Sequence, residues 1–248
     1  MFKNSIVIPT YNQFERLKEC IESIKTTTDL KRTEVVVVAN GSKEETEKYI
    51  LALGEPFRLI SSKKALGFTR AVNIGIMAAS GENIILLNDD AMILDWGSND
   101  EWIKMLETPF VDPKMAVTGA SKDYWAKDKP FLVFFCVMIP KKILLQFGLL
   151  DEAFSPGAGE DADFCIKVQQ AGYKIRQVPK EFNYWYGEFP LCHVGGISCA
   201  SLKEWDDIVI RNNAILESRC PRTDADREYQ KAFSKGFQLS EIWEKNNC

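Results

Sequence analysis

The stretch Glu34–Ser42, with the sequence EVVVVANGS, decides the fold class. Its residues Val35 to Ala39 are apolar at every position, whereas a strand with one face in water alternates apolar and polar side chains. A strand of this kind is covered on both faces, as the strands of a parallel sheet are. Asn40-Gly41-Ser42 then ends the strand before a charged helix, which we predict over residues 43–53.

The sequence on either side repeats this order of strand, loop and helix. We predict further strands over residues 5–8, 57–60 and 83–87, and helices over residues 13–24 and 66–79. Strands that alternate with helices are joined by right-handed crossovers and form a parallel sheet with helices on both faces. The pattern therefore predicts an α/β fold, with no internal repeat and no low-complexity linker.

The second half of the chain is less regular. A polar stretch runs from Leu94 to Lys129 and holds one predicted strand at 115–118. After it we predict a single buried strand over residues 131–139, a short helix over 141–147 and a helix over 160–171 that ends at Gly172. Beyond Ser201 the sequence is helical in character and more charged, so the regular alternation of strand and helix belongs to the first half only.

Length and composition exclude several functional classes. The chain has 248 residues, with 46% hydrophobic and 27% charged residues, which is typical of a soluble globular protein of one large or two small domains. Lys and Arg total 31 against 35 Asp and Glu, so no basic excess is available for nucleic-acid phosphates. The apolar runs are too short for a membrane span or a signal peptide. We expect a soluble cytoplasmic protein.

The cysteines do not indicate a zinc site. The seven cysteines include no CxxC pair, and the chain has a single histidine, His193. Cys20, Cys136, Cys165 and Cys192 lie in apolar segments, where a reduced cysteine behaves as a small buried side chain. Such cysteines are typical of a reducing compartment.

Two acidic clusters are candidates for chemistry. Ligands of an open α/β sheet bind beyond the carboxyl ends of its strands, and Asn88-Asp89-Asp90 stands at such an end. Two carboxylates there need a positive partner, which a divalent cation would supply; a strand-terminating turn is the alternative. The second cluster, Glu160-Asp161-Ala162-Asp163, opens a predicted helix, where acids also suit the helix dipole. His193, before two glycines, is either a ligand or a structural residue.

Six motifs resemble, in order and spacing, those of the family 2 glycosyltransferases, and especially their rhamnosyltransferase-like branch. They are SIVIPTYNQFERLKECIESI from Ser5, VVVVANGS from Val35, ALGFTRAVNIGIMAASGENIILLNDD from Ala65, GLLDEAF from Gly148, GEDADFCIKVQQAGYKI from Gly159 and HVGG from His193. The resemblance implies the GT-A fold, a mostly parallel central sheet flanked by helices, with C-terminal helices. Residues 1–200 would form the glycosyltransferase domain, with a nucleotide-binding half at 1–95 and an acceptor-binding half at 96–200. Residues 201–248 would be a helical extension packed on the same domain.

The resemblance also implies an activity. A family member transfers a sugar from a nucleotide-diphosphate donor to a hydroxyl of a carbohydrate or glycoconjugate, with inversion at the anomeric carbon. It implies that Asp90 and His193 bind Mn²⁺ or Mg²⁺, which stabilises the negative charge on the departing diphosphate. It further implies that Asp161 is the general base that accepts the proton of the acceptor hydroxyl.

The remaining site residues follow from the same resemblance. Donor binding is implied for Pro9, Thr10, Tyr11, Ala39, Asn40, Gly67, Arg70, Asn73, Asn88 and Asp89, and acceptor binding for Glu160 and Asp163. Trp185 and Tyr186 are further acceptor candidates, because aromatic rings in a polar loop can stack on the apolar faces of sugars. The chain departs from the family pattern at Ala39, where relatives usually have an Asp that recognises the edge of the base. The identity of the nucleotide base therefore stays open.

Several alternatives also stay open. The aromatic clusters Tyr124-Trp125 and Tyr184-Trp185-Tyr186 either stack on sugars or pack in an interface or the core. The apolar stripe around Phe233 and Trp243 is interpreted as core packing, with a homodimer interface or peripheral membrane contact as alternatives. The rival functions are an inactive nucleotide-sugar-binding protein, which Ala39 motivates, and a sugar nucleotidyltransferase, whose Gly-rich basic loop is absent near the N-terminus. A glycoside hydrolase fits the acids less well.

Overall fold

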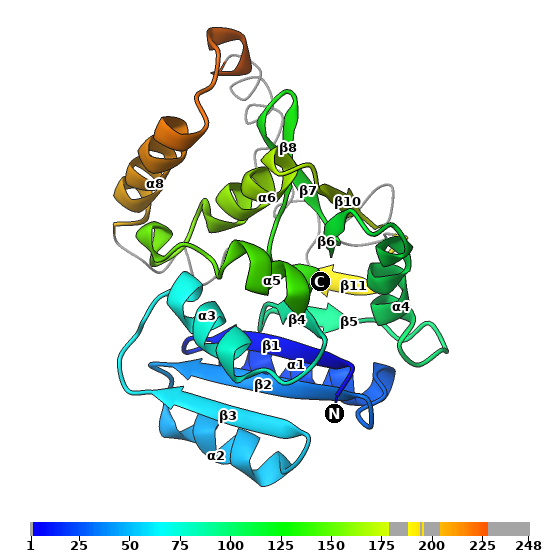
Figure 1. Cartoon of the computed structure of the whole chain (residues 1–248). Coiled ribbons are helices and arrows are strands. Elements are labelled where there is room, and N and C mark those ends of the chain that lie inside the picture. Colours follow the sequence, from blue (N-terminus) through cyan, green and yellow to red (C-terminus); the bar gives the residue numbers. More distant parts are fainter. Residues whose placement is uncertain (1, 179–187, 194, 196–203, 228–248) are drawn as a thin grey trace, which may run out of the picture.

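The computed structural model describes residues 2–178, 188–193, 195 and 204–227. Its centre is a seven-stranded sheet with the strand order β10-β6-β9-β4-β1-β2-β3 (Figure 1). Neighbouring strands are parallel, except that β9 is antiparallel to both β4 and β6. The strands are β1 (Asn4–Thr10), β2 (Thr33–Asn40), β3 (Phe57–Ser62), β4 (Asn83–Leu87), β6 (Met115–Gly119), β9 (Cys136–Pro140) and β10 (Lys174–Gln177). The predicted α/β class with a mostly parallel sheet is confirmed.

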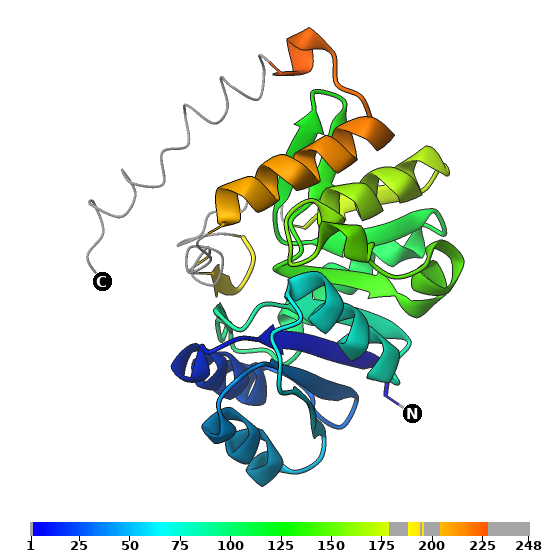
Figure 2. The ribbon, with the colours of Figure 1, turned by 90° about the vertical axis from the view of Figure 1, so that its left-hand side faces the viewer.

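Helices cover both faces of this sheet. They are α1 (Phe14–Thr27), α2 (Glu44–Leu53), α3 (Phe68–Ala78), α4 (Glu101–Glu107), α5 (Lys141–Phe147), α6 (Glu160–Gln170) and α8 (Trp205–Arg219), with short 3₁₀ helices η1 (Thr108–Val111) and η2 (Glu152–Phe154). Side chains of α1, α2 and α4 fill one apolar cluster, and those of α3, α5 and α6 fill a cluster on the opposite face. Figure 2 shows α1 and α3 on opposite sides of β1.

The valines of β2 show why this segment decides the fold. Val35 and Val37 pack into the cluster with α1, and Val36 packs into the cluster with α3. All three side chains are fully buried, so the strand has no face in water. Burying a side chain of this size contributes about 1.5–3 kcal/mol, which is why an unbroken apolar run is stable only at the centre of such a sheet.

Two small sheets complete the fold. β5 (Ala91–Ile93) pairs antiparallel with β11 (Leu191–His193), so that Ala91 lies opposite His193. β7 (Lys122–Ala126) and β8 (Lys129–Leu132) form a hairpin. The first of these pairs matters for the site, because it brings a distant part of the chain next to the residues that follow β4.

The prediction of one strand over residues 131–139 is wrong, because this run contains the end of β8 and most of β9. Residues 133–135 lead from the hairpin into the central sheet. Phe134 packs into the cluster with α3, while Phe135 packs into the cluster with α1. The break between β8 and β9 falls where two adjacent phenylalanines enter different clusters. The sequence shows only an unbroken apolar run there, so the break cannot be predicted from it. Helix α4 and strand β7, within the stretch described as polar, were also missed.

Helix α8 packs on the second half of the chain. Leu216 and Cys220 share an apolar cluster with Phe154 and Trp125, and Trp125 Nε1 donates a hydrogen bond to the carbonyl oxygen of Cys220 at 2.9 Å. Trp125 therefore packs in the core. Cys192 is only half-buried, contrary to the expectation for an apolar segment. The predicted stripe with Phe233 and Trp243 lies outside the described residues.

None of the helices in the described part of the chain combines the length and the apolar character needed to cross a bilayer.

Candidate active site

The carboxyl ends of β1, β2 and β4 meet at one edge of the sheet. β1 ends at Thr10, which lies opposite Ala39 at the end of β2. β4 lies on the other side of β1, and Asn88, Asp89 and Asp90 follow it directly. The structure therefore brings the predicted donor residues of these three strands to the same edge.

Asp90 and His193 are in direct contact at this edge. His193 Nε2 lies 3.1 Å from Asp90 Oδ1, and the amide of Gly195 donates to Asp90 Oδ2 at 3.1 Å. The imidazole stacks on the ring of Phe135, with 4.1 Å between ring centroids and 6° between planes. Both side chains are buried, with 8% and 9% exposure. Two residues that the sequence analysis assigned to a metal ion thus form one pair.

Asp89 lies beside this pair and is itself buried. Its Oδ2 atom, like Oδ1 of Asn88, has no hydrogen-bond partner among the described residues. The pKa of Asp89 is raised to about 7, mainly because the side chain is buried. Hydrogen bonds from the Thr10 side chain and the Tyr11 backbone oppose this shift, and the charge of Asp90 adds to it. Buried oxygens without a donor are costly in a folded protein, so a ligand that supplies a positive charge or a hydrogen-bond donor would stabilise this edge.

The pKa of Asp90 moves in the opposite direction. Burial alone would raise it, but the hydrogen bond and charge of His193 and the amide of Gly195 outweigh burial, so that the pKa lies below its usual range. Asp90 is therefore ionised at neutral pH. A stable carboxylate is the form that binds a hard cation.

The residues at this edge fit a divalent cation. Mg²⁺ is usually held by one or two carboxylates, with substrate phosphates and water as its other ligands. Asp90 and Asp89 would supply carboxylates, and His193 would supply a ring nitrogen in its neutral form. Within the described ranges, no three His, Cys, Asp or Glu side chains are grouped so that they could hold a metal ion by themselves.

A second group of acids lies at the start of α6. Asp161 is half-buried, and its Oδ1 accepts a hydrogen bond from the amide of Ala162 at 2.8 Å. The pKa of Asp161 is raised to about 6, mainly because the side chain is buried. Hydrogen bonds from nearby amides oppose this shift, and the charge of Asp123, on β7, adds to it. A carboxylate that ionises close to neutral pH is suited to general base catalysis.

Glu160 precedes this aspartate and is more deeply buried. Its Oε2 atom has no hydrogen-bond partner in the part of the chain that the structure describes. Burial and then the charge of Asp161 raise the pKa of Glu160 to about 8. At neutral pH the two neighbours therefore differ: Glu160 keeps its proton while Asp161 is ionised.

The loop before α3 joins the donor edge to the second half of the chain. Asn40 Oδ1 accepts a hydrogen bond from the amide of Leu66 at 2.5 Å, and its Nδ2 donates to the carbonyl oxygen of Gly67 at 3.4 Å. Gly67 has a φ of +84°, and a Cβ there would lie 2.5 Å from Cα of Pro156. Gly67 is thus required for close backbone packing, and its predicted role in donor binding stays a prediction.

Arg70 and Asn73 contact residues of the segment before α6. Asn73 Nδ2 donates to the carbonyl oxygen of Leu150 at 2.8 Å, and its Oδ1 accepts from the amide of the same residue at 3.0 Å. Arg70 Nε donates to Glu152 Oε2 at 3.1 Å. Asn73 is buried, and a contact with ribose or diphosphate would require these bonds to break. The assignment of Arg70 and Asn73 to donor binding stays a prediction.

The predicted acceptor residues are less fully placed. Asp163 is buried and forms an ion pair with Arg219 of α8, at 2.8 Å between Oδ1 and Nη1. Trp185 and Tyr186 lie outside the described residues. Three further residues near the site are not evident from the sequence. Phe135 is hidden in an apolar run, Asp123 lies on a strand that the sequence pattern does not predict, and Arg219 belongs to no motif.

A comparison with known families gives a direct match. The model of the family described as glycosyl transferase family 2 matches residues 5–144, more than half of the chain. The matched segment includes the sheet edge with Asp89 and Asp90, and it ends before α6. An uncharacterized glycosyltransferase of Bacillus subtilis (strain 168) is 34% identical over 106 residues, which cover 43% of this chain and 39% of that protein. The chain spans less than two fifths of the length of the curated relatives it matches.

Solved structures show the same fold. A mannosyltransferase from Pyrobaculum calidifontis, in complex with GDP-Man and Mn²⁺, superposes with a TM-score of 0.59 at 15% identity, over 97% of this chain and 82% of that one. GalNAc-T7 with UDP, GalNAc and Mn²⁺ superposes with a TM-score of 0.66 at 15% identity, over 88% and 48% of the two chains. At this level of identity the likeness establishes the fold, which is GT-A.

Proposed function

The chain belongs to glycosyl transferase family 2, and we propose that it transfers a hexosyl group from a nucleotide-diphosphate donor to an acceptor hydroxyl, with inversion at the anomeric carbon. The observation that carries this proposal is the buried acidic edge after β4, where Asp89 lies beside the pair of Asp90 and His193. We further propose that the acceptor is a carbohydrate or a glycoconjugate, and that the chain is a member of the rhamnosyltransferase-like branch, as its sequence motifs suggest.

Asp90 and His193 would hold Mn²⁺ or Mg²⁺, with Asp89 beside them. When bound, such an ion stabilises the negative charge that develops on the departing diphosphate. The chain prepares this site in two ways. The amide of Gly195 orients the Asp90 carboxylate, and Phe135 fixes the plane of the imidazole and covers one of its faces.

Asp161 accepts the proton of the acceptor hydroxyl. As the hydroxyl oxygen forms a bond to the anomeric carbon, the bond from that carbon to the diphosphate oxygen breaks, and its electron pair leaves with the nucleoside diphosphate. Attack and departure on opposite faces of the sugar produce inversion. General base catalysis of this kind contributes about 10² to 10⁴ in rate. Glu160, which keeps its proton at neutral pH, is suited to donate a hydrogen bond to the acceptor.

The nucleotide is proposed to lie over the ends of β1 and β2. The side chain of Thr10 is buried there, beside the carboxyl group of Asp89. Ala39 is fully buried and offers a methyl group where relatives usually have an acid. Hydrogen bonds to the base would therefore come from the main chain of Pro9 to Tyr11 or from Asn40.

A screen of nucleotide sugars tests the function. Each donor is added with Mn²⁺ or Mg²⁺, and the melting temperature is measured; a ligand at 100 times its Kd stabilises a fold by about 2.7 kcal/mol. We expect one class of donor to raise the melting temperature only when a cation is present. The same donor should then release nucleoside diphosphate in the presence of an acceptor mixture.

Asp161→Asn is the control for turnover, because it should keep the donor-induced shift and lower the rate of transfer by about 10² to 10⁴. The absence of any shift with either cation would contradict the proposed function. A shift without release of nucleoside diphosphate would instead indicate a nucleotide-sugar-binding protein, and formation of a sugar nucleotide would indicate a nucleotidyltransferase.

A further inference from the structure

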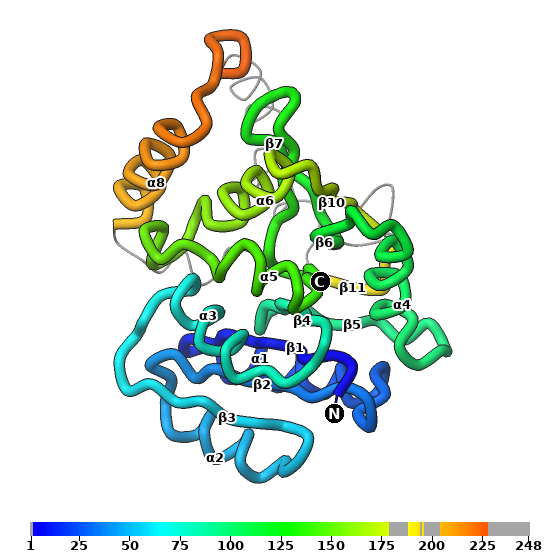
Figure 3. Tube along the Cα trace, viewed as in Figure 1, coloured from blue at the N-terminus to red at the C-terminus, as the bar shows by residue number. Residues whose placement is uncertain are grey.

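The segment that leads into the proposed general base is held from two sides. We call residues 150–158 the 150–158 loop; it connects α5 to α6 and includes η2. In the trace of Figure 3, this loop lies between α3 and α8. On the α3 side it is bound by Asn73 and Arg70, as described above, and Ser155 Oγ donates to the carbonyl oxygen of Leu66 at 3.2 Å. The loop is therefore fixed to the donor half of the molecule.

Asn212 of α8 holds the loop from the other side. Its side chain is 1% exposed, and its Nδ2 atom lies 2.8 Å from each of three carbonyl oxygens, those of Phe154, Gly157 and Ala158. Ala158 has a φ of +75°, which a residue with a Cβ rarely adopts. Three carbonyl oxygens that point at one place need a shared donor, because buried carbonyls without a partner destabilise a fold. Asn212 supplies that donor.

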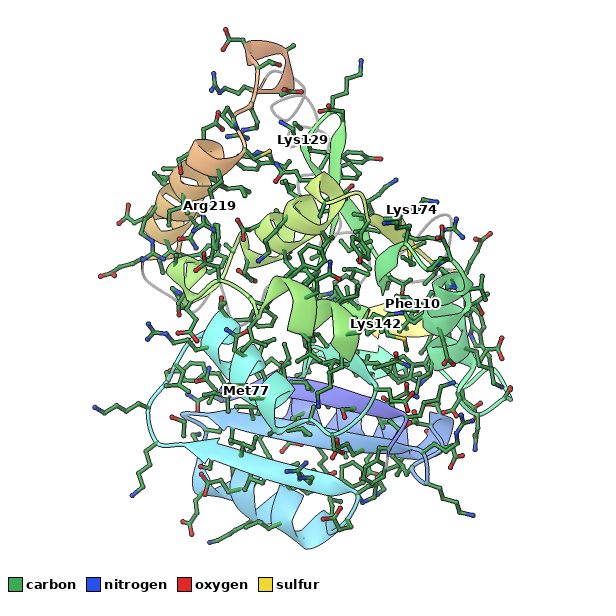
Figure 4. The ribbon with its side chains drawn as sticks, in the orientation of Figure 1. Met77, Phe110, Lys129, Lys142, Lys174 and Arg219 are labelled. Atoms are coloured by element: carbon green, nitrogen blue, oxygen red, sulfur yellow. The ribbon has the colours of Figure 1, made fainter. Side chains whose placement is uncertain are left out.

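Arg219 lies two turns further along α8. It binds one residue that precedes Asp161 in the sequence and one that follows it. Its Nη1 donates to Asp163 Oδ1 at 2.8 Å, and its Nη2 donates to Asp151 Oδ2 at 2.7 Å. The guanidinium group also lies over the ring of Phe154, 5.2 Å from its centroid. Figure 4 labels Arg219 on α8. One side chain thus ties the start of the loop to the first turn of α6.

We propose that Asn212 and Arg219 are positioning residues for Asp161, so that α8 sets where the general base stands relative to the donor. This inference rests on the proposed function. Both residues lie outside the segment that the family model matches, and neither belongs to a motif in the sequence. The physical reason is that a general base must meet the acceptor hydroxyl within hydrogen-bond distance, and a misplacement of about 1 Å can cost about 10²-fold in rate.

The test uses Arg219→Met, which keeps an unbranched apolar side chain over Phe154 and removes both ion pairs. Arg227→Met is the matched control, because Arg227 is paired with Glu217 of α8 and with Asp224, and contacts neither α6 nor the loop in the interactions described. We expect Arg219→Met to lower kcat by about 10- to 100-fold. The Kd of the donor with Mn²⁺ should stay within about twofold of wild type, and Arg227→Met should match wild type.

A double-mutant cycle separates positioning from general damage. If Arg219 acts through Asp161, then Arg219→Met should cause little further loss in the Asp161→Asn background, because effects that operate through one group are not additive. An equal loss in both backgrounds would overturn the inference, as would a kcat unchanged by Arg219→Met. If Arg219→Met does not fold, Arg219→Lys takes its place. Lysine keeps the positive charge but cannot bind Asp163 and Asp151 at once through a guanidinium group, so we expect a smaller loss of kcat than for Arg219→Met.

The two proposals fail in different ways. A wild-type protein that turns over none of the donors refutes the proposed function. A wild-type protein that is active while the Arg219 and Asn212 variants keep its kcat refutes the role of α8 alone. Asn212→Ala provides the second measurement, with the same expected fall in kcat and the same unchanged affinity for the donor.

Discussion

The dependence of transfer on pH follows directly from the surroundings of Asp161. Burial, and next to it the charge of Asp123, raise the pKa of Asp161 to about 6, while backbone amides oppose this shift. If Asp161 is the general base, as proposed, it must be ionised to accept a proton, so kcat should rise with pH through this value and then level off. Glu160 keeps its proton in this range, because its own pKa is about 8.

The size of the fall in kcat at low pH distinguishes a raised pKa of Asp161 from the usual pKa of an aspartate. With a pKa of about 6, about one tenth of the enzyme is in the active form at about pH 5, so kcat should fall about tenfold between about pH 7.5 and about pH 5. With the usual aspartate pKa of about 3.9, more than about nine tenths would stay active at about pH 5. The assay is release of nucleoside diphosphate at saturating donor, acceptor and Mn²⁺.

A substitution next to the base identifies the titrating group. Asp123→Asn removes a charge that raises the pKa of Asp161, so it should shift the rise in kcat to lower pH. Glu160→Gln should leave this rise in place, because Glu160 is neutral over that range. A kcat that is flat from about pH 5 upward, or a rise that Asp123→Asn does not move, would refute the assignment of Asp161 as the base.

Three further predictions concern the cation site, the buried glutamate and the core. His193→Ala should raise the Mn²⁺ concentration that gives half-maximal activity by about tenfold or more, and a chelator should abolish transfer until Mn²⁺ is restored; unchanged activity would leave His193 a structural residue. The raised pKa of Glu160 stabilises the fold below about pH 4.5, and this contribution is lost as pH rises through about 8. Glu160→Gln should therefore raise the melting temperature above about pH 8 and leave it nearly unchanged below about pH 4.5; equal shifts at both would contradict this reasoning. Gly75→Ala would place a Cβ against Val7, and urea titration should show a loss of about 1–3 kcal/mol.

The first half of the fold could be predicted because its signals are local. The uninterrupted burial of β2 appears in the sequence as four consecutive valines, and the acids after β4 appear as a polar break after an apolar run. Parallel strands then bring their carboxyl ends together as a matter of topology. The edge that carries Thr10, Ala39 and Asp90 was therefore predictable without coordinates.

The second half could not be predicted in the same way. The break between β8 and β9 depends on which cluster each of Phe134 and Phe135 enters, and both residues are equally apolar in the sequence. Asn212 is an ordinary polar residue in a charged helix until the three carbonyls of the 150–158 loop are placed around it. Contacts between segments more than fifty residues apart leave no periodic signal.

The pairing of β5 with β11 has a consequence for how the protein acquires its activity. This two-stranded ribbon joins Ala91 to His193, roughly a hundred residues apart in the chain, and contacts over such distances form late because loop closure must precede them. The βαβ units of β1 to β4 can fold while the histidine is still absent from the edge. In a nascent or partly unfolded chain, we expect Asp89 and Asp90 to be in place at the sheet edge while His193 is still absent. The affinity of the proposed site for the cation should therefore increase only when folding is complete.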